Sequence, residues 1–275
     1  MRMRRYPAPL IRSIFFCTLP VLSLGGCGTL PDGRLWGQEV TFSPGWERIR
    51  ASALQAAGDP WVWAPLAGAA GLQFSGWDRK ISTWAVRETP LFSSPESASS
   101  WSDGLRDATG IANATIVLLA PSGEDAKSWL LNKTKGYAVD LAASGAAGLT
   151  TNLLKSISGR TRPSRADDKS FPSGHTAIAA THGRLAARNL EYLDLRPVTR
   201  QRLVHALDAL TLATAWARVE AGAHYPSDTL VSIALGNFSA NFFKNAFMGA
   251  GAASSQDIAV TTTDGGLMLH FSARF

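Results

Sequence analysis

Cysteine is nearly absent from this sequence. Its 275 residues include two cysteines, Cys17 and Cys27, and none follows Cys27. A disulfide framework or a cysteine-ligated metal site therefore cannot form in the body of the chain. The histidines and carboxylates are not spaced as metal ligands either, so the sequence predicts neither a metal site nor a cofactor.

Charged residues and long apolar runs are also scarce. Only 17% of the residues are charged and 45% are hydrophobic, which is typical of a folded chain and excludes a disordered one. The net charge of +6 does not indicate nucleic-acid binding, because the residues after Cys27 include 23 basic and 21 acidic side chains and no basic stripe. The apolar runs 61–74 and 111–120 are shorter than the roughly 20 residues of a membrane-spanning helix.

Residues 1–26 are predicted to be a lipoprotein signal peptide. Four arginines precede an apolar run from Ser13 to Leu24, and Leu24-Gly25-Gly26-Cys27 resembles the box at which bacterial lipoproteins are cleaved and lipidated. Cys27 would then carry the lipid and anchor the chain in the cell envelope, facing the periplasm. Gly28 favours the outer membrane over the inner one. An ordinary secretory signal or an N-terminal anchor is the alternative.

Turn residues and periodicity divide the rest of the chain into three parts. Residues 27–60 are predicted to be a tether, 61–248 a helical domain and 249–275 a tail. Residues 61–74 are interpreted as a buried core helix. Because seven of the nine tryptophans precede residue 102, a segment in a membrane interface stays open as the alternative. The tail alternates apolar and polar residues around Asp264-Gly265-Gly266, which predicts a short C-terminal β-hairpin.

Helical spacing of apolar residues is clearest in the second half of the chain. Gly159 and Gly222 are placed where a helix ends, and Pro226 is placed where one begins. A Ser- and Pro-rich loop is expected at 89–103. The predicted helices are 46–57 within the tether, and 77–88, 137–158, 174–190, 200–220 and 227–247 after it.

Three clusters of polar residues lie between residues 155 and 228. Together they suit a bound phosphate, because cations neutralise its charge, one imidazole attacks phosphorus and another donates a proton. The first turn of the helix predicted at 174 adds free backbone N–H groups and the positive end of the helix dipole. The clusters are Lys155-x6-Arg162-Pro163, Pro172-Ser173-Gly174-His175 and Arg218-x5-His224-x3-Asp228.

In this order and at these spacings, the clusters resemble the signature of the type 2 phosphatidic acid phosphatase and vanadium haloperoxidase superfamily. That signature usually has serine before the arginine of the third motif, where this sequence has Ala217. The resemblance implies an all-α fold, a helical bundle of the phosphatidic acid phosphatase type 2 kind, with the site at the helix ends.

The resemblance also implies a role for each matching residue. His224 is expected to attack phosphorus and form a phosphohistidine, while Asp228 holds its other ring nitrogen. His175 is expected to protonate the leaving oxygen. The phosphate-binding residues are expected to be Lys155, Arg162, Ser173, Gly174 and Arg218.

The resulting prediction is a metal-independent phosphatase for a phosphate monoester or diphosphate, and membrane attachment favours a lipid phosphate. A vanadate-dependent haloperoxidase using the same pocket and an envelope lipoprotein without catalytic activity are the alternatives. The expected partners are a phosphorylated lipid or small phosphate ester and the membrane, but no nucleic acid.

Overall fold

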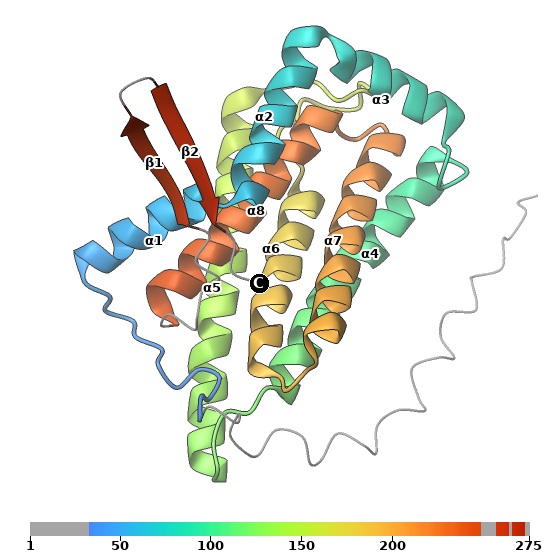
Figure 1. The fold of residues 1–275 in the computed structure, drawn as a ribbon. Coiled ribbons are helices and arrows are strands. Elements are labelled where there is room, and N and C mark those ends of the chain that lie inside the picture. The colour runs from blue at the N-terminus through green and yellow to red at the C-terminus, as the bar shows by residue number, and fades with distance from the viewer. Residues whose placement is uncertain (1–32, 249–256, 264–265, 273–275) are drawn as a thin grey trace, which may run out of the picture.

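The computed structural model describes residues 33–248, 257–263 and 266–272, and helices dominate it (Figure 1). This confirms the predicted all-α fold of the domain. The helices are α1 (Trp46–Gly58), α2 (Pro60–Ser75), α3 (Trp77–Glu88), α4 (Pro95–Leu119), α5 (Ala126–Ser158), α6 (Gly174–Asn189), a 3-10 turn η2 (Leu190–Tyr192), α7 (Pro197–Glu220) and α8 (Pro226–Phe247).

Local sequence sets where these helices begin and end. Four of them start with proline, whose fixed φ suits the first helical position and whose missing N–H is not needed there. The Asp125 carboxylate caps α5 by accepting from the N–H groups of Lys127 and Ser128. Gly159 ends α5 in the left-handed conformation at φ 53°, as its position in the sequence predicts.

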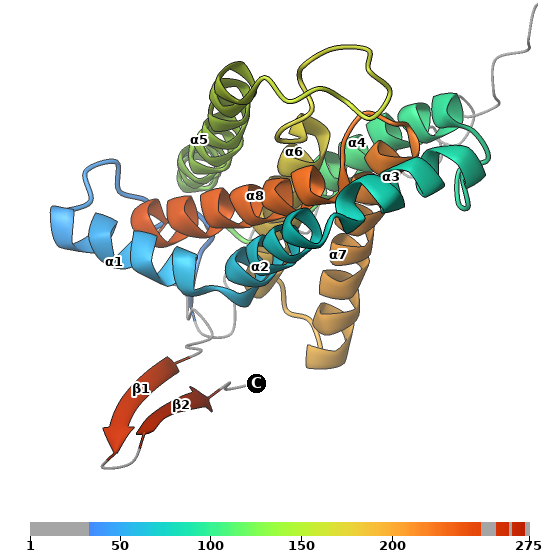
Figure 2. The ribbon, with the colours of Figure 1, turned by 90° about the horizontal axis from the view of Figure 1, so that it is seen from above.

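Helix α6 is the centre of the bundle and packs against α4, α5, α7 and α8 (Figure 2). Small residues allow the close approach. A Cβ on Gly236 of α8 would lie 2.5 Å from the backbone oxygen of Ala177, and one on Gly183 of α6 would lie 2.9 Å from Oγ1 of Thr211. The core therefore depends on glycine and alanine at the crossings more than on large aliphatic side chains.

A buried polar network ties α5, α6 and α8 together. Lys244 Nζ lies 2.8 Å from Asp140 Oδ1 and donates to Asn189 Oδ1 at 2.6 Å. Asn189 donates in turn to Asp140 Oδ2 at 3.0 Å and to Asn113 Oδ1 at 2.8 Å. Both charges are nearly inaccessible to solvent, so each one depends on the other for its stability.

The structure corrects the predicted tether over residues 33–58. Trp36 is fully buried, its Nε1 donates to Asn189 Oδ1 at 2.7 Å, and its ring fills the space over Gly136. Helix α1 packs along α8. These residues are part of the helical domain, because a buried indole with a hydrogen-bonded N–H holds the segment against α5 and α6.

Two further predictions were wrong in this half of the chain. The apolar run 61–74 forms α2, but only Val62 and Ala69 are buried and most of its large side chains face outward, so it is not a core helix. The loop expected at 89–103 ends at Ser94, and α4 begins at Pro95. Ser94 caps that helix by accepting from the N–H of Ser97 at 3.1 Å.

Strands β1 (Asp257–Thr263) and β2 (Gly266–Ser272) pair antiparallel, with Asp257 opposite Ser272 and Thr263 opposite Gly266. Residues 264–265 of the predicted turn and the whole predicted signal peptide, including Cys27, lie outside the described residues. Among the described helices, none is both long enough and apolar enough to cross a membrane.

Candidate active site

The three polar clusters meet at one end of the bundle. The C-terminal ends of α5 and α7 and the N-terminal ends of α6 and α8 lie together there, with the loop 159–173 running over them (Figure 1). Lys155 is in the last turn of α5 and His175 in the first turn of α6. His224 lies in the short turn between α7 and α8.

His224 is buried, with 1% of its surface exposed. Its Nδ1 is hydrogen-bonded to the backbone carbonyl oxygen of Ser170. Because a carbonyl oxygen can only accept, Nδ1 carries the proton and the lone pair of the neutral ring lies on Nε2. Burial, followed by the positive charges of Arg218 and Lys155, holds the pKa of His224 well below its usual value. The ring is therefore a neutral imidazole whose Nε2 has a free lone pair.

Asp228 does not hold the His224 ring directly, and that prediction was wrong. Its Oδ2 accepts from the Ser170 hydroxyl at 2.5 Å and from the Tyr225 N–H at 2.9 Å. Ser170 stands between the two residues, since its carbonyl accepts from His224 while its hydroxyl donates to Asp228. Burial raises the pKa of Asp228, and the hydrogen bond from Ser170 acts against that rise. Asp228 thus orients the His224 ring through Ser170.

Two residues that no sequence motif indicates, Arg160 and Asp78, complete this arrangement. Arg160 donates to Asp228 Oδ1 at 2.5 Å and to Asp78 Oδ2 at 2.7 Å. Asp78 also accepts from the N–H and hydroxyl of Ser227, at 2.8 Å and 2.6 Å. Asp78 thereby locks α3 to the first turn of α8. It lies 82 residues before Arg160, and no sequence pattern links the two.

Arg218 is the most deeply buried of the predicted phosphate-binding cations, with 7% of its surface exposed. One of its terminal nitrogens donates to Ser102 Oγ at 3.1 Å, and its buried Nε has no hydrogen-bond partner. Burial and the neighbouring charge of Arg162 lower the pKa of Arg218 to about 10. A buried donor without a partner next to a second cation favours a bound anion. The hydroxyl missing at Ala217 is matched here by hydroxyls from α4.

Lys155 and Arg162 lie close to Arg218 and share its environment. Burial, followed by the charge of Arg162, lowers the pKa of Lys155 to about 8. Its Nζ donates to the backbone oxygen of Lys169 at 2.9 Å. Arg162 is held by Asp167, with its Nε 2.6 Å from Oδ1. The cations repel one another at this end of the bundle, and a phosphate would relieve that repulsion.

Ser173 and Gly174 occupy the start of α6, as predicted, but Ser173 is already engaged within the fold. Its Oγ caps the helix by accepting from Thr176, and its N–H donates to Ser232 Oγ at 2.7 Å. The Ser173 N–H is therefore engaged, whereas the Ser173 hydroxyl only accepts in these bonds and its own proton can still be donated to a phosphate. A Cβ on Gly174 would meet only Thr151, at an ordinary 3.7 Å, so internal packing does not require glycine there.

His175 pairs with Asp103, which the sequence did not identify. The Nε2 of His175 lies 2.7 Å from Oδ1 of Asp103 on α4. Because a carboxylate accepts, Nε2 carries a proton, and a protonated ring also offers the N–H at Nδ1. Burial and the charge of Arg218 lower the pKa of His175, whereas Asp103 raises it. Asp103 lies where a loop was predicted, which is why it was missed.

The position of α4 beside the site is set by Glu220. This fully buried carboxylate accepts from the backbone N–H groups of Leu91 and Phe92, at 3.1 Å and 3.0 Å. It therefore fixes the loop that leads into α4 and its residues Ser102 and Asp103. Within the part of the chain that the structure describes, no group of three or more His, Cys, Asp and Glu side chains could hold a metal ion.

Comparison with known proteins supports the arrangement. The family model of the PAP2 superfamily matches residues 137–251, which contain all three motifs. Among solved structures, the chain is similar to the crystal structure described as the first transmembrane PAP2 type phosphatidylglycerolphosphate phosphatase from Bacillus subtilis. The identity is 21%, the TM-score is 0.50, and the match covers 72% of this chain and 94% of the other. A search of curated proteins gave no match. Residues 137–251 are therefore similar to the PAP2 superfamily, and the solved structure shares the helical fold of this chain.

Proposed function

We propose that this protein is a phosphatase that hydrolyses a phosphate monoester or diphosphate, preferably on a lipid, through a phosphohistidine intermediate. The observation that carries the proposal is the state of His224. It is a neutral imidazole whose Nδ1 proton is held by Ser170, and it lies in the field of three cations. Nucleophilic nitrogen and concentrated positive charge are what the attack on an anionic phosphoryl group needs.

In the first step, Nε2 of His224 forms a bond to phosphorus, and the bond from phosphorus to the leaving oxygen breaks. His175 gives a proton to that oxygen, so the alcohol or phosphate leaves in protonated form. Arg218, Arg162 and Lys155 stabilise the charge on the phosphoryl oxygens as it redistributes. The Ser170 carbonyl keeps the Nδ1 proton and stabilises the positive ring that forms.

In the second step, water attacks the phosphohistidine and the bond between nitrogen and phosphorus breaks. His175, now neutral, accepts a proton from that water, so the acid of the first step becomes the base of the second. Inorganic phosphate leaves and both histidines return to their starting protonation states. Asp103 favours this exchange because its carboxylate stabilises the protonated form of His175.

A lipid substrate is supported by the surface around the site. Helix α3, which Asp78 locks to the first turn of α8, exposes Trp77 and Trp84, and 90% of the surface of Phe74 on the preceding helix is exposed. Exposed tryptophans favour the boundary between lipid and water. The similar Bacillus subtilis protein is described as a phosphatidylglycerolphosphate phosphatase. We propose that lipidated Cys27 holds this chain at the membrane on the periplasmic side.

The test is release of inorganic phosphate by the purified protein from phosphatidic acid, an isoprenoid diphosphate and phenyl phosphate. His224→Ala and His175→Ala should each reduce turnover to background while the circular dichroism spectrum stays unchanged. His205→Ala is the matched control, since His205 is an exposed histidine of α7 outside the site. Its activity should equal that of the unmodified chain.

Two results would contradict the proposal. Full activity in His224→Ala would remove the nucleophile from its role. No phosphate release from any substrate, together with bromination by the vanadate-loaded protein, would establish the haloperoxidase instead. Trapping labelled phosphate on the protein by rapid acid-free quenching should succeed in the unmodified chain and fail in His224→Ala.

A further inference from the structure

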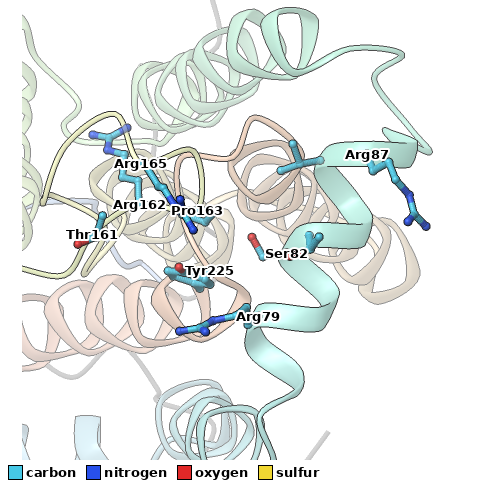
Figure 3. Close-up of a pocket in the computed structure, with 10 residues that line it drawn as sticks. Arg79, Ser82, Arg87, Thr161, Arg162, Pro163, Arg165 and Tyr225 are labelled. Carbon is cyan, nitrogen blue, oxygen red and sulfur yellow. The ribbon is translucent and has the colours of Figure 1, made fainter.

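A pocket of about 670 Å³ adjoins the candidate active site on the side of α3 (Figure 3). It lies between α3 and the loop 161–165, with Tyr225 between them. One wall comes from the PAP2 motif region and the other from α3, which lies before the matched residues 137–251. The residues that line it are Arg79, Ser82, Thr83, Val86, Arg87, Thr161, Arg162, Pro163, Arg165 and Tyr225.

The lining of this pocket is strongly cationic. It contains four arginines and no acidic residue. Arg162 is paired with Asp167, and Arg87 is paired with Glu88 and points away from the others (Figure 3). Within the described part of the chain, Arg79 and Arg165 have no ion pair and no side-chain hydrogen bond. Two positive charges on opposite walls therefore lack a counterion, which favours an anionic ligand.

Ser82 provides an independent sign of a ligand. The residue is 1% exposed and lines the pocket, yet its hydroxyl oxygen has no hydrogen-bond partner. Buried hydroxyl groups are almost always paired, because losing their hydrogen bonds to water is costly. A phosphate oxygen in the pocket would accept from this hydroxyl. Asp78, one turn before Ser82 on α3, is hydrogen-bonded to Ser227 of α8. These bonds hold Ser82 beside the site.

The pocket and the proposed phosphate site share one residue, Arg162. Arg162 belongs to both, since it lines the pocket and its charge lowers the pKa of Lys155 and Arg218. Tyr225 directly follows the nucleophile His224. Its ring is held by the guanidinium of Arg160, 4.2 Å from the ring centre. A ligand that fills the pocket would therefore extend from the reacting phosphoryl group toward α3.

We propose that this pocket binds a second phosphate group of the substrate, through Arg79, Arg165 and the Ser82 hydroxyl. The inference rests on the proposed function and narrows it, since substrates with two phosphate groups are preferred over simple monoesters. The second group has two chemical sources. It is either the distal phosphate of a diphosphate, joined through one oxygen, or a phosphodiester separated from the reacting monoester by a glycerol unit.

Binding is tested first, without turnover, by calorimetry with two probes that differ by one phosphonate: methylenediphosphonate and methylphosphonate. The bisphosphonate should bind more tightly to the unmodified protein. Arg79→Gln and Arg165→Gln should each reduce that preference roughly five- to tenfold, because each removes one charge-assisted hydrogen bond at a partly exposed site. Lys80→Gln is the matched control, an exposed cation of the same helix that lies outside the pocket and should leave the preference unchanged.

Turnover then distinguishes the two sources. In each variant, kcat/KM is measured for an isoprenoid diphosphate and for a glycerolipid with a phosphodiester and a terminal monoester. Each value is divided by kcat/KM for phenyl phosphate. The ratio that falls in both arginine variants identifies which separation of the two phosphate groups the pocket fits. If neither variant changes the binding preference or either ratio, the second phosphate site does not exist. If no substrate turns over but the binding preference falls as expected, the pocket stands and the phosphatase does not.

Discussion

Asp103 should control the pH dependence of the reaction although it does not touch the substrate. Its carboxylate lies 2.7 Å from Nε2 of His175, the proposed general acid. Burial lowers the pKa of His175 and Asp103 raises it, so replacing Asp103 by Asn should lower that pKa further. His175 acts as the acid only while protonated, so activity is present below its pKa and is lost as the pH rises through it. Asp103→Asn should therefore move the basic limb of the pH profile of kcat/KM to lower pH.

The size of the effect follows from the exposure of the pair. A hydrogen bond to a charged group contributes about 1.5–3 kcal/mol when it is well shielded. The Asp103 side chain is 54% exposed and that of His175 is 29% exposed, so solvent screening reduces this contribution to about 1–1.5 kcal/mol. That free energy corresponds to a roughly five- to tenfold loss of kcat/KM at a pH on the basic side.

The assay measures kcat/KM against pH for phenyl phosphate and for nitrophenyl phosphate. The nitrophenyl leaving group needs less protonation, so its hydrolysis should be less affected by Asp103→Asn, a difference that a purely structural defect would not produce. Asp107→Asn is the matched control, because Asp107 lies one turn further along α4 and pairs with Arg106. An unshifted basic limb in Asp103→Asn, or equal losses for the two substrates, would refute the role of the pair.

Three other perturbations test the network and the core. Arg160→Gln removes the link between Asp78 and Asp228 and should lower kcat roughly tenfold or more, with KM nearly unchanged, in steady-state assays. Lys244→Met leaves the buried Asp140 charge unpaired and should lower the free energy of unfolding by about 3–5 kcal/mol in urea titrations; adding Asp140→Asn should restore part of it. Gly136→Ala places a Cβ 2.5 Å from the Trp36 ring and should destabilise by about 1–3 kcal/mol, whereas Gly145→Ala on the same helix, with no atom within 4 Å, should not.

The second half of the chain was predictable because local signals and tertiary structure agree there. Proline and glycine mark the ends of α7 and α8, and the motif residues are placed close to those ends. The bundle buries these helices around α6, so their periodicity of small apolar residues reports a real core face. The predicted cluster of Lys155, Arg162, Arg218 and His224 is brought together for the same reason.

Predictions failed in the first half of the chain because the same residue types occur both in loops and at the starts of helices. Ser94 and Pro95 were interpreted as loop residues, yet serine at the cap and proline at the first position also begin a helix. Because a loop was predicted there, Ser102 and Asp103 of α4 were not identified as residues of the site. The apolar run 61–74 is a helix, but its sequence does not show what packs against each face, and most of its large side chains are 40% or more exposed. Trp36 is the opposite case: it lies in a segment predicted to be a tether, yet its side chain is fully buried.

Asp228 shows that two residues close together in a sequence motif need not be in contact in the structure. Asp228 lies four residues after His224, but the chain turns into α8 between them, and its carboxylate turns back to cap the helix at Tyr225. What reaches the His224 ring is the Ser170 carbonyl, from the loop that also carries Arg162. The proposed nucleophile and one of the proposed phosphate-binding cations are therefore held by the same loop, and Asp228 holds that loop through the Ser170 hydroxyl. A shift of the loop would move both groups together, so their geometry relative to a bound phosphoryl group is preserved, which is what preorganised stabilisation of a transition state requires.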